Sequence, residues 1–286
     1  MKIETIFEKK KPVLSFEIFP PKKEAALRNI DETLEALSRL HPDFISVTFG
    51  AGGSSNHNQT VELAKKIKQQ YHVEPLVHLT CLSYSREEIL NILEQLKDAE
   101  IQSILALRGD VNPNVEKKYD FCYASDLVTF IKQNGDFGIS GACYPETHIE
   151  AENEREDIMN LKKKTNGGVN HLISQLFFNN KVFYDFQSKV KSEGIHVPIE
   201  AGIMPVINKA QIEKMTSLCG ASIPDDLNRI MVKYKNDQEA LFDAGIDYAV
   251  AQISDLLAHN VDGIHIFTMN NPRVARKLYE GIKHHL

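Results

Sequence analysis

Short apolar runs alternate with longer amphipathic segments along the whole chain. The runs are rich in β-branched and aromatic residues and almost free of polar ones, which is typical of parallel strands buried on both faces. They predict eight strands, at residues 13–19, 44–49, 75–81, 104–107, 138–144, 172–178, 199–206 and 263–268. The segments between and after them predict helices at 24–40, 58–71, 86–99, 124–133, 152–165, 182–192, 209–218, 225–234, 238–259 and 272–285.

The segment at 86–99 gives the clearest helix signal. Its apolar residues recur at spacings of three and four, as on a helix with one buried face. Ser85 precedes the segment and Glu88 follows three residues later, which is the pattern of a capping box.

Eight strand–helix units in 286 residues predict a (β/α)8 TIM barrel with extra helices before the eighth strand. A doubly wound open sheet is the alternative, because both folds share the alternation. The sequence has no linker rich in proline, glycine and serine, so we expect a single catalytic domain over residues 1–286.

Composition and charge narrow the class of protein. A net charge of -6 argues against a nucleic-acid partner. The apolar runs are too short to span a bilayer, and residues 1–11 lack the apolar core of a secretory signal. The four cysteines are widely spaced and include no C-x-x-C pair, so we expect reduced thiols. These features predict a cytoplasmic protein without a membrane partner.

The first predicted strand carries one carboxylate, Glu17, inside an apolar run that ends at Pro20 and Pro21. A charge in a buried strand is costly unless it is paired or neutralised. An edge strand with Glu17 facing water would explain it simply, but a closed barrel has no edge strands. We therefore expect Glu17 to lie in a pocket.

Polar residues also occur at the carboxyl ends of most other predicted strands, where a barrel builds its active site. Gln175 is the unusual case, because it lies within an otherwise apolar predicted strand. The residues at these ends are Thr48, His78, Arg108, Asp110, Tyr144, His148 and Asn270. Together they predict one site at this face of the barrel.

Two other kinds of site fit the sequence less well. Residues 50–55 resemble a dinucleotide fingerprint, but Ser55 replaces the third glycine and no acidic residue ends the next strand. The glycines more simply let the backbone turn closely over a ligand. His78, Asp110, His148 and His265 lack the close spacing of metal ligands, so we expect no metal.

A series of motifs resembles the methylenetetrahydrofolate reductase family. They are Ser-Phe-Glu-Ile-Phe-Pro-Pro-Lys at 15–22, Ser-Val-Thr-Phe-Gly at 46–50, His-Leu-Thr-Cys at 78–81, Leu-Ala-Leu-Arg-Gly-Asp at 105–110, Tyr-Ala-Ser-Asp-Leu at 123–127, Tyr-Pro-Glu at 144–146, and Gln175 with its following phenylalanines. The resemblance covers essentially the whole chain and is to the short bacterial form. It implies that no regulatory domain follows the barrel.

The resemblance implies an FAD-dependent oxidoreductase that uses NADH or NADPH as co-substrate. The implied reaction is reduction of 5,10-methylenetetrahydrofolate to 5-methyltetrahydrofolate by ping-pong hydride transfer, which supplies methyl groups for methionine synthesis. The implied partners are the folate substrate, the nicotinamide and further copies of the chain in a homo-oligomer.

The resemblance also implies roles for individual residues. Glu17 is similar to the general acid that opens the methylene bridge, and Asp110 to the carboxylate beside the flavin and the pterin. The remaining folate-side positions are Gln175, Gln211, Met215 and Asn271. The FAD-contacting positions are Thr48, His78, Arg108, Gly109, Asp110, Tyr123, Ala124, Tyr144, His148, Asp157, Asn160, Lys163 and Lys164.

These implied roles are physically reasonable. An apolar strand favours the protonated form of an acid such as Glu17. Asp110 can stabilise a developing iminium cation and disfavour an anionic reduced flavin. Arg108, Lys163 and Lys164 can offset diphosphate charge. A metal-assisted hydrolase or aldolase on the same barrel, and a flavin- or folate-binding protein without catalysis, are the alternatives.

Overall fold

The computed structural model describes residues 1–21, 27–49, 57–111 and 118–286. Eight parallel strands form a closed barrel in chain order, and β8 pairs with β1 to complete it. Their bounds are β1 Val13–Ile18, β2 Phe44–Val47, β3 Glu74–Thr80, β4 Ser103–Leu107, β5 Gly138–Cys143, β6 His171–Ser174, β7 Ile199–Ile203 and β8 Gly263–Phe267. The predicted TIM barrel is confirmed, and the open-sheet alternative is wrong because no strand of this sheet is an edge.

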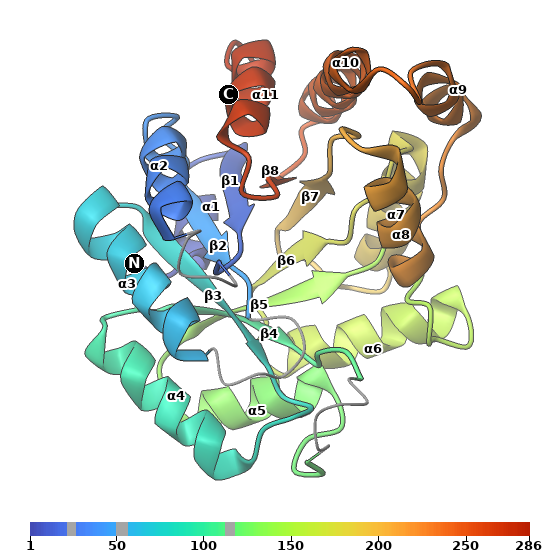
Figure 1. Ribbon diagram of the computed structural model, residues 1–286. Helices are drawn as coiled ribbons and strands as arrows, with labels where there is room; N and C mark the ends of the chain where they lie inside the picture. The colour runs from blue at the N-terminus through green and yellow to red at the C-terminus, as the bar shows by residue number, and fades with distance from the viewer. Residues whose placement is uncertain (22–26, 50–56, 112–117) are drawn as a thin grey trace.

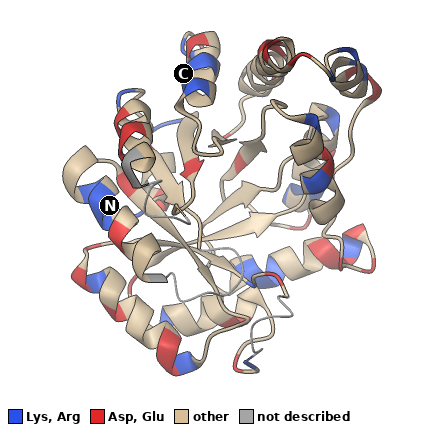
Figure 2. Ribbon diagram, viewed as in Figure 1, with Lys and Arg blue, Asp and Glu red and all other residues tan. Residues whose placement is uncertain are grey.

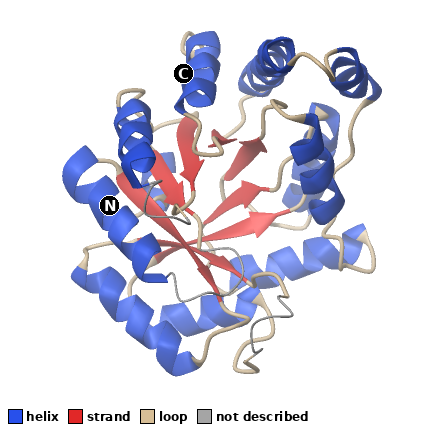
Figure 3. Ribbon diagram, in the orientation of Figure 1, coloured by secondary structure: helices blue, strands red, loops and turns tan. Residues whose placement is uncertain are grey.

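Helices surround the strands, as Figure 3 shows. After the short α1 they are α2 Leu27–Ser38, α3 His57–Tyr71, α4 Arg86–Asp98, α5 Ala124–Asn134, α6 Glu154–Asn166, α7 Asn180–Ser192, α8 Lys209–Cys219, α9 Asp225–Lys233, α10 Gln238–Ala258 and α11 Pro272–Ile282. The predicted extra helices before the eighth strand are confirmed as part of the run α8 to α10 (Figure 1). Among the described residues, no helix combines the length and apolarity needed to cross a bilayer.

The capping box predicted for α4 is present. Glu88 donates its backbone N–H to Ser85 Oγ at 3.2 Å, and Ser85 donates its own to Glu88 Oε2 at 2.6 Å. Such a cap stabilises a helix by about 1 kcal/mol. The predicted apolar face of α4 is buried against the barrel.

The prediction for β6 was too long. The strand ends at Ser174, so the interpretation of Gln175 as a residue within a strand is wrong. The apolar run continues because Leu176 and Phe178 pack into a cluster with residues of α8 to α10. Phe177 stacks on Phe183 of α7 at 4.8 Å. The residues after Ser174 are thus apolar because they are buried beneath the outer helices, and this made the predicted strand too long.

The N-terminal end of the barrel is closed by α1 (Glu4–Phe7), which the sequence analysis did not predict. Ile3, Ile6 and Phe7 are buried there against the lowest inward-facing side chains of the strands, which include Val13 and Phe44. Figure 1 shows α1 behind the strands. The lowest layer of the barrel interior is thus mostly apolar, and its Ser103 hydroxyl accepts from the Ile3 N–H at 3.0 Å.

Above this layer the interior becomes polar. The strand residues that face the helices are apolar, as predicted for a covered sheet. Inward-facing side chains are different, and the fully buried polar ones are Ser15, Ser46, Ser103, Ser140, His171, Glu200 and His265. Figure 2 shows most charged residues on the outer helices and few on the strands. The buried polar interior leads toward the carboxyl ends of the strands.

Candidate active site

Glu17 lies in β1 between β2 and β8, and its side chain is 18% exposed. Its Oε2 is 3.6 Å from Nε2 of His78 and 3.7 Å from Nε2 of His265. The carboxylate thus lies near the carboxyl end of β1 between two buried histidines. The edge-strand reading of Glu17 is wrong, because β1 is paired on both sides.

The backbone around Glu17 is held by the residues that follow β8. Thr268 donates its hydroxyl to the carbonyl of Glu17 at 2.6 Å. The amide of Asn270 donates to the Phe19 carbonyl at 2.8 Å and accepts from the Phe19 N–H at 3.0 Å. These side chains close the seam between the ends of β8 and β1, so they fix the position of Glu17.

His78 is a neutral neighbour of Glu17. Burial lowers the pKa of His78 to about 4, although the carboxylate of Glu17 acts in the opposite direction. A neutral imidazole can donate to a carboxylate or accept from a protonated carboxyl. His78 Nε2 has no hydrogen-bond partner among the described residues. Glu17 therefore has a neighbour that tolerates either of its protonation states.

The loop after β4 carries the predicted residues Arg108, Gly109 and Asp110. Arg108 forms a two-pronged ion pair with Glu150, with Nη2 2.8 Å from Oε1. Gly109 has a φ of +85°, and a Cβ there would lie 3.0 Å from Cβ of Thr80. Both the backbone angle and the close approach require glycine. This turn leaves Asp110 exposed after the carboxyl end of β4. Glu17 lies on β1, which is not a neighbour of β4 in the barrel.

Tyr144, His148, Asp157 and Lys164 gather between β5 and α6. The rings of Tyr144 and His148 are 4.5 Å apart edge to face, and Asp157 Oδ2 accepts from the His148 N–H at 2.9 Å. Tyr144, Asp157 and Lys164 line a small cavity. Burial raises the pKa of Asp157 and lowers that of Lys164. Lys164 donates to the Ala142 carbonyl at 2.5 Å, so it faces the barrel wall.

The other predicted cofactor positions lie on neighbouring elements. Thr48 follows β2 and donates its N–H to the Ile18 carbonyl at 2.9 Å. Tyr123 is exposed and precedes Ala124, the first residue of α5. On α6, the exposed Lys163 donates to Asn160 Oδ1 at 3.3 Å.

This donor set is chemically suited to a flavin dinucleotide. Cationic side chains for the phosphates are present on the β4 loop and on α6, although Arg108 is paired with Glu150 and Lys164 faces the wall. Lys163 is the exposed cation of the set. The Tyr144 and His148 rings add an aromatic pair at the carboxyl end of β5. The residues therefore fit the group that the sequence implies.

The predicted folate-side residues divide into two groups. Gln175 follows β6, where its N–H donates to the Cys143 carbonyl at 2.7 Å and its Oε1 accepts from the Leu176 N–H at 2.8 Å. Gln211 and Met215 lie one turn apart on α8, and Met215 packs against the cluster that contains Leu176. The structure thus brings Gln175, Gln211 and Met215 to one side.

Asn271 belongs to a different element. Its Oδ1 accepts from the Arg273 N–H at 3.0 Å and caps α11. Arg273 forms a two-pronged ion pair with Glu239 and lies 4.0 Å from the ring centroid of Phe242. The charge of Arg273 is therefore already engaged with α10.

Of the four residues considered as metal ligands, the structure brings only His78 and His265 together, at Glu17. Within the described ranges, no group of three or more His, Cys, Asp or Glu side chains could hold a metal ion. The glycine-rich segment at 50–55 lies outside the described residues.

The sequence analysis missed Glu200, which is fully buried in β7. Its signal was the one that identified Glu17, namely a carboxylate within an apolar run. Ser15 was also missed, and it donates to Glu200 Oε1 at 2.8 Å. Serine in a strand gives no comparable signal, because it is small and uncharged.

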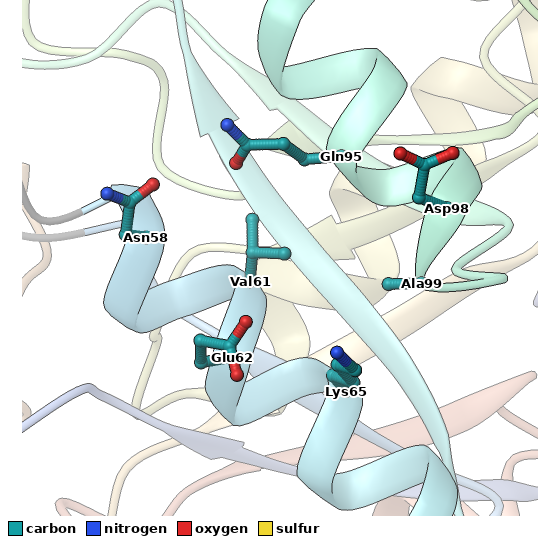
Figure 4. Close-up of a pocket in the computed structure, with 7 residues that line it drawn as sticks. All are labelled: Asn58, Val61, Glu62, Lys65, Gln95, Asp98 and Ala99. Atoms are coloured by element: carbon teal, nitrogen blue, oxygen red, sulfur yellow. The ribbon is translucent and has the colours of Figure 1, made fainter.

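A larger groove lies elsewhere, between α3 and α4 (Figure 4). It has a volume of about 290 Å³ and is lined by Asn58, Val61, Glu62, Lys65, Gln95, Asp98 and Ala99. None of the strand-end residues described above lines it. It is not the candidate site, because it lies between two outer helices, away from the polar residues at the carboxyl ends of the strands.

Residues 2–283 match the family model described as methylenetetrahydrofolate reductase. The chain belongs to the methylenetetrahydrofolate reductase family. This membership makes it an oxidoreductase. The resemblance stated from the motifs is confirmed.

Two relatives show how far this similarity extends. "5,10-methylenetetrahydrofolate reductase" of Pectobacterium carotovorum subsp. carotovorum is 35% identical over 262 residues, which cover 92% of this chain and 87% of the relative. "Methylenetetrahydrofolate reductase (NADH) 1" of Arabidopsis thaliana is 36% identical over 290 residues, which cover 96% of this chain. The matched part is 49% of the plant protein, so the chain spans about half of its length.

Among solved structures, an uncharacterized protein from Clostridium thermocellum, described as binding two copies of 5-methyl-5,6,7,8-tetrahydrofolic acid, superposes with a TM-score of 0.72. The two chains cover each other completely at 16% sequence identity. At this identity the likeness supports the barrel fold alone.

Proposed function

We propose that this member of the family reduces 5,10-methylenetetrahydrofolate to 5-methyltetrahydrofolate, with FAD as cofactor and NADH or NADPH as the source of the hydride. The observation that carries the proposal is the position of Glu17, which is fixed between His78 and His265 near the carboxyl end of β1. The product would supply methyl groups for methionine synthesis.

Glu17 acts as the general acid in this proposal. It gives its proton to N10 of the folate, the bond between N10 and the bridging carbon breaks, and an iminium ion forms at N5. Hydride addition to the bridging carbon then completes the methyl group. The substrate gains one proton and one hydride, so Glu17 must take up a proton once in each turnover. Its buried imidazole neighbours suit a group that alternates between two protonation states.

Bound FAD would supply the chemistry of accepting a hydride from the nicotinamide and passing it to the folate. The residues proposed to hold it are Thr48, His78, Arg108, Gly109, Asp110, Tyr123, Ala124, Tyr144, His148, Asp157, Asn160, Lys163 and Lys164. Lys163 and Arg108 offer positive charge to the phosphates, and Gly109 lets the β4 loop approach closely. Asp110, exposed in the same loop, would stabilise the cationic iminium.

The folate would lie over the side formed by β6 and α8. Gln175 has an amide that can hydrogen-bond a pterin, and Gln211 presents a second amide from α8. Met215 lies one turn further along and can pack against an aromatic ring through its thioether. Asn271 is a further folate-side candidate at the start of α11.

Two half-reactions followed separately test the proposal. The protein as purified should be yellow, and NADH or NADPH should bleach it under anaerobic conditions; the plant relative's name makes NADH the first donor to try. Methylenetetrahydrofolate should then restore the colour and yield methyltetrahydrofolate, with ping-pong kinetics in the steady state.

Three results would contradict the proposal. A colourless protein with stoichiometric metal would support a metal-assisted hydrolase or aldolase. A yellow protein that no nicotinamide bleaches would support a binding protein. Kinetics that require both substrates to be bound together would refute the alternation at one site.

A further inference from the structure

A series of neighbouring polar side chains lies in the barrel interior and leads to Glu17. Its outermost link is His265, whose Nε2 is 3.7 Å from Glu17 Oε2. The other nitrogen, Nδ1, is 2.6 Å from Ser15 Oγ, and Ser15 Oγ is 2.8 Å from Glu200 Oε1. Four side chains from three adjacent strands, β7, β8 and β1, therefore connect in series.

The chain continues beyond Glu200 on the other side of the barrel. Glu200 Oε2 is 3.0 Å from His171 Nε2, and His171 Nδ1 is 2.9 Å from Ser140 Oγ. Glu200 Oε2 and His171 Nε2 lie close together, but the angle between them does not make a hydrogen bond, and neither atom has another partner among the described residues.

The protonation of Glu200 decides the direction of these hydrogen bonds. An ionised Glu200 can only accept, so it takes the hydroxyl proton of Ser15. Ser15 then has only its oxygen lone pairs left, so a neutral His265 must donate from Nδ1 and present the bare Nε2 to Glu17 at 3.7 Å and to the Ser46 hydroxyl at 3.5 Å. A protonated Glu200 can instead donate to Ser15. Ser15 then donates to Nδ1, and His265 presents Nε2–H toward Glu17 and the Ser46 hydroxyl, which lie 3.7 and 3.5 Å from Nε2.

We propose that Glu200 is a positioning residue for Glu17, which directs Ser15 and His265 so that an imidazole N–H faces the Glu17 carboxylate. This inference rests on the proposed role of Glu17 as general acid. The N–H favours the carboxylate that remains after Glu17 has protonated the folate. Without it, the lone pair of Nε2 faces that carboxylate, which makes transfer of the proton to the folate less favourable. At 3.7 Å the two atoms need to approach by about 0.7 Å to form a hydrogen bond.

The surroundings of Glu200 keep it protonated at neutral pH. Burial raises the pKa of Glu200 to about 8, and Asp43 and Asp262 act in the same direction. His265 and the hydroxyl of Ser15 act in the opposite direction.

The other groups near Glu200 do not supply a compensating charge. Burial lowers the pKa of His171 to about 3, so its ring is neutral beside Glu200. Asp43 and Asp262, below the strands, are each paired with a lysine, Lys10 and Lys11. Glu200 is thus protonated below about pH 8 and ionised above it.

The state of His265 can be measured directly by nitrogen-15 NMR of the histidine side chains in the purified holoprotein. A His265→Asn variant assigns the resonances of His265 by their loss. In the native protein, we expect hydrogen on Nε2 at pH 7 and on Nδ1 at pH 9. Hydrogen on Nδ1 at pH 7, or one tautomer at both pH values, would overturn the proposal.

Glu200→Gln gives the matched test. The glutamine amide donates to Ser15 at every pH, so His265 should keep hydrogen on Nε2 from pH 7 to pH 9. Glu74→Gln is the control, because Glu74 is a strand glutamate paired with Lys68 outside this chain of side chains. It should switch tautomer as the native protein does. A switch in Glu200→Gln as well would show that another group controls His265.

The pH profile links this state to the reaction. One titrating proton with a midpoint near pH 8 predicts a loss of about 10-fold in the folate half-reaction between pH 7 and pH 9. Glu200→Gln should reduce this ratio to near 1, while the rate of reduction by NADH should show neither effect. An unchanged ratio in Glu200→Gln would refute the link. The NMR result does not depend on turnover, so absence of folate reduction in the native protein would refute the proposed function separately.

Discussion

Replacing Glu17 by glutamine removes the proposed acid and keeps the shape of the side chain. The introduced amide would still fit between His78 and His265, because an amide can donate to an imidazole or accept from it. An amide cannot give up a proton to the folate nitrogen at a useful rate. We therefore expect Glu17→Gln to retain FAD and its reduction by NADH, and to lose the folate half-reaction.

The size of the loss follows from the burial of the site. General acid catalysis contributes about 10²- to 10⁴-fold, which corresponds to about 2.7–5.4 kcal/mol of activation free energy. Glu17 is 18% exposed, so water has limited access to replace it as the acid. We expect a loss of at least about 100-fold in the folate half-reaction, at the lower end of that range. The free energy of unfolding should change by less than about 1 kcal/mol, because the side chain keeps its volume.

Anaerobic stopped-flow absorbance measures the two half-reactions separately in the same sample. NADH should bleach the flavin of Glu17→Gln within about 3-fold of the native rate, since no proton from Glu17 enters that step. Methylenetetrahydrofolate should then restore the colour at least about 100-fold more slowly than in the native protein. Urea unfolding of the same preparation checks its stability.

The outcome that refutes the acid role is an equal loss in both half-reactions, which would make Glu17 a structural residue. A folate half-reaction within about 10-fold of the native rate would also refute it, because general acid catalysis is worth more than that. Glu74→Gln is the matched control. It removes a strand carboxylate that pairs with Lys68 and the N-terminal amine, and should leave both half-reactions intact.

Asp110→Asn should raise the flavin potential and slow folate reduction more than NADH oxidation, and an unchanged potential in a redox titration would contradict the electrostatic role. Gly109→Ala should lower the free energy of unfolding by about 1–3 kcal/mol, measured in urea, because alanine is strained at a φ of +85°. The third prediction concerns acid. Burial lowers the pKa of His78 to about 4 and that of His171 to about 3. Each histidine therefore decreases the free energy of unfolding by about 1.4 kcal/mol for every unit by which the pH falls below about 6.5. The raised pKa of Glu200 acts with the opposite sign, so the net loss from these three groups between pH 6.5 and pH 4.5 is about 1.4 kcal/mol per unit, and a flat or rising urea stability would refute it.

The barrel could be predicted because each strand is covered by helices, and this side of every strand is apolar. The predicted strand bounds were wrong where an apolar run continued beyond the end of the strand. The β6 run continued through Phe178 because that residue is buried beneath the extra helices. The helix α1 could not be predicted, since four residues are too few to show a helical period.

The site was predictable where a residue was out of place in its own segment. Glu17 was recognised as a charge in an apolar strand, and its neighbours His78 and His265 come from β3 and β8, which only closure of the barrel brings to β1. No local pattern contains that contact. Glu200 carried the same local signal as Glu17, so its omission was a failure of interpretation. Ser15 gave no signal, because its importance lies entirely in its partners.

Among the described residues, α1 and the residue before it cover the N-terminal end of the barrel interior with apolar side chains. Ile3, Ile6 and Phe7 are buried across this end, directly below the layer that contains His171 and Glu200. These buried apolar side chains hinder the exchange of interior protons with water at this end of the barrel. A folate seated over Glu17 would hinder this exchange at the other end, so the interior would keep, during hydride transfer, the number of protons it held when the substrate bound.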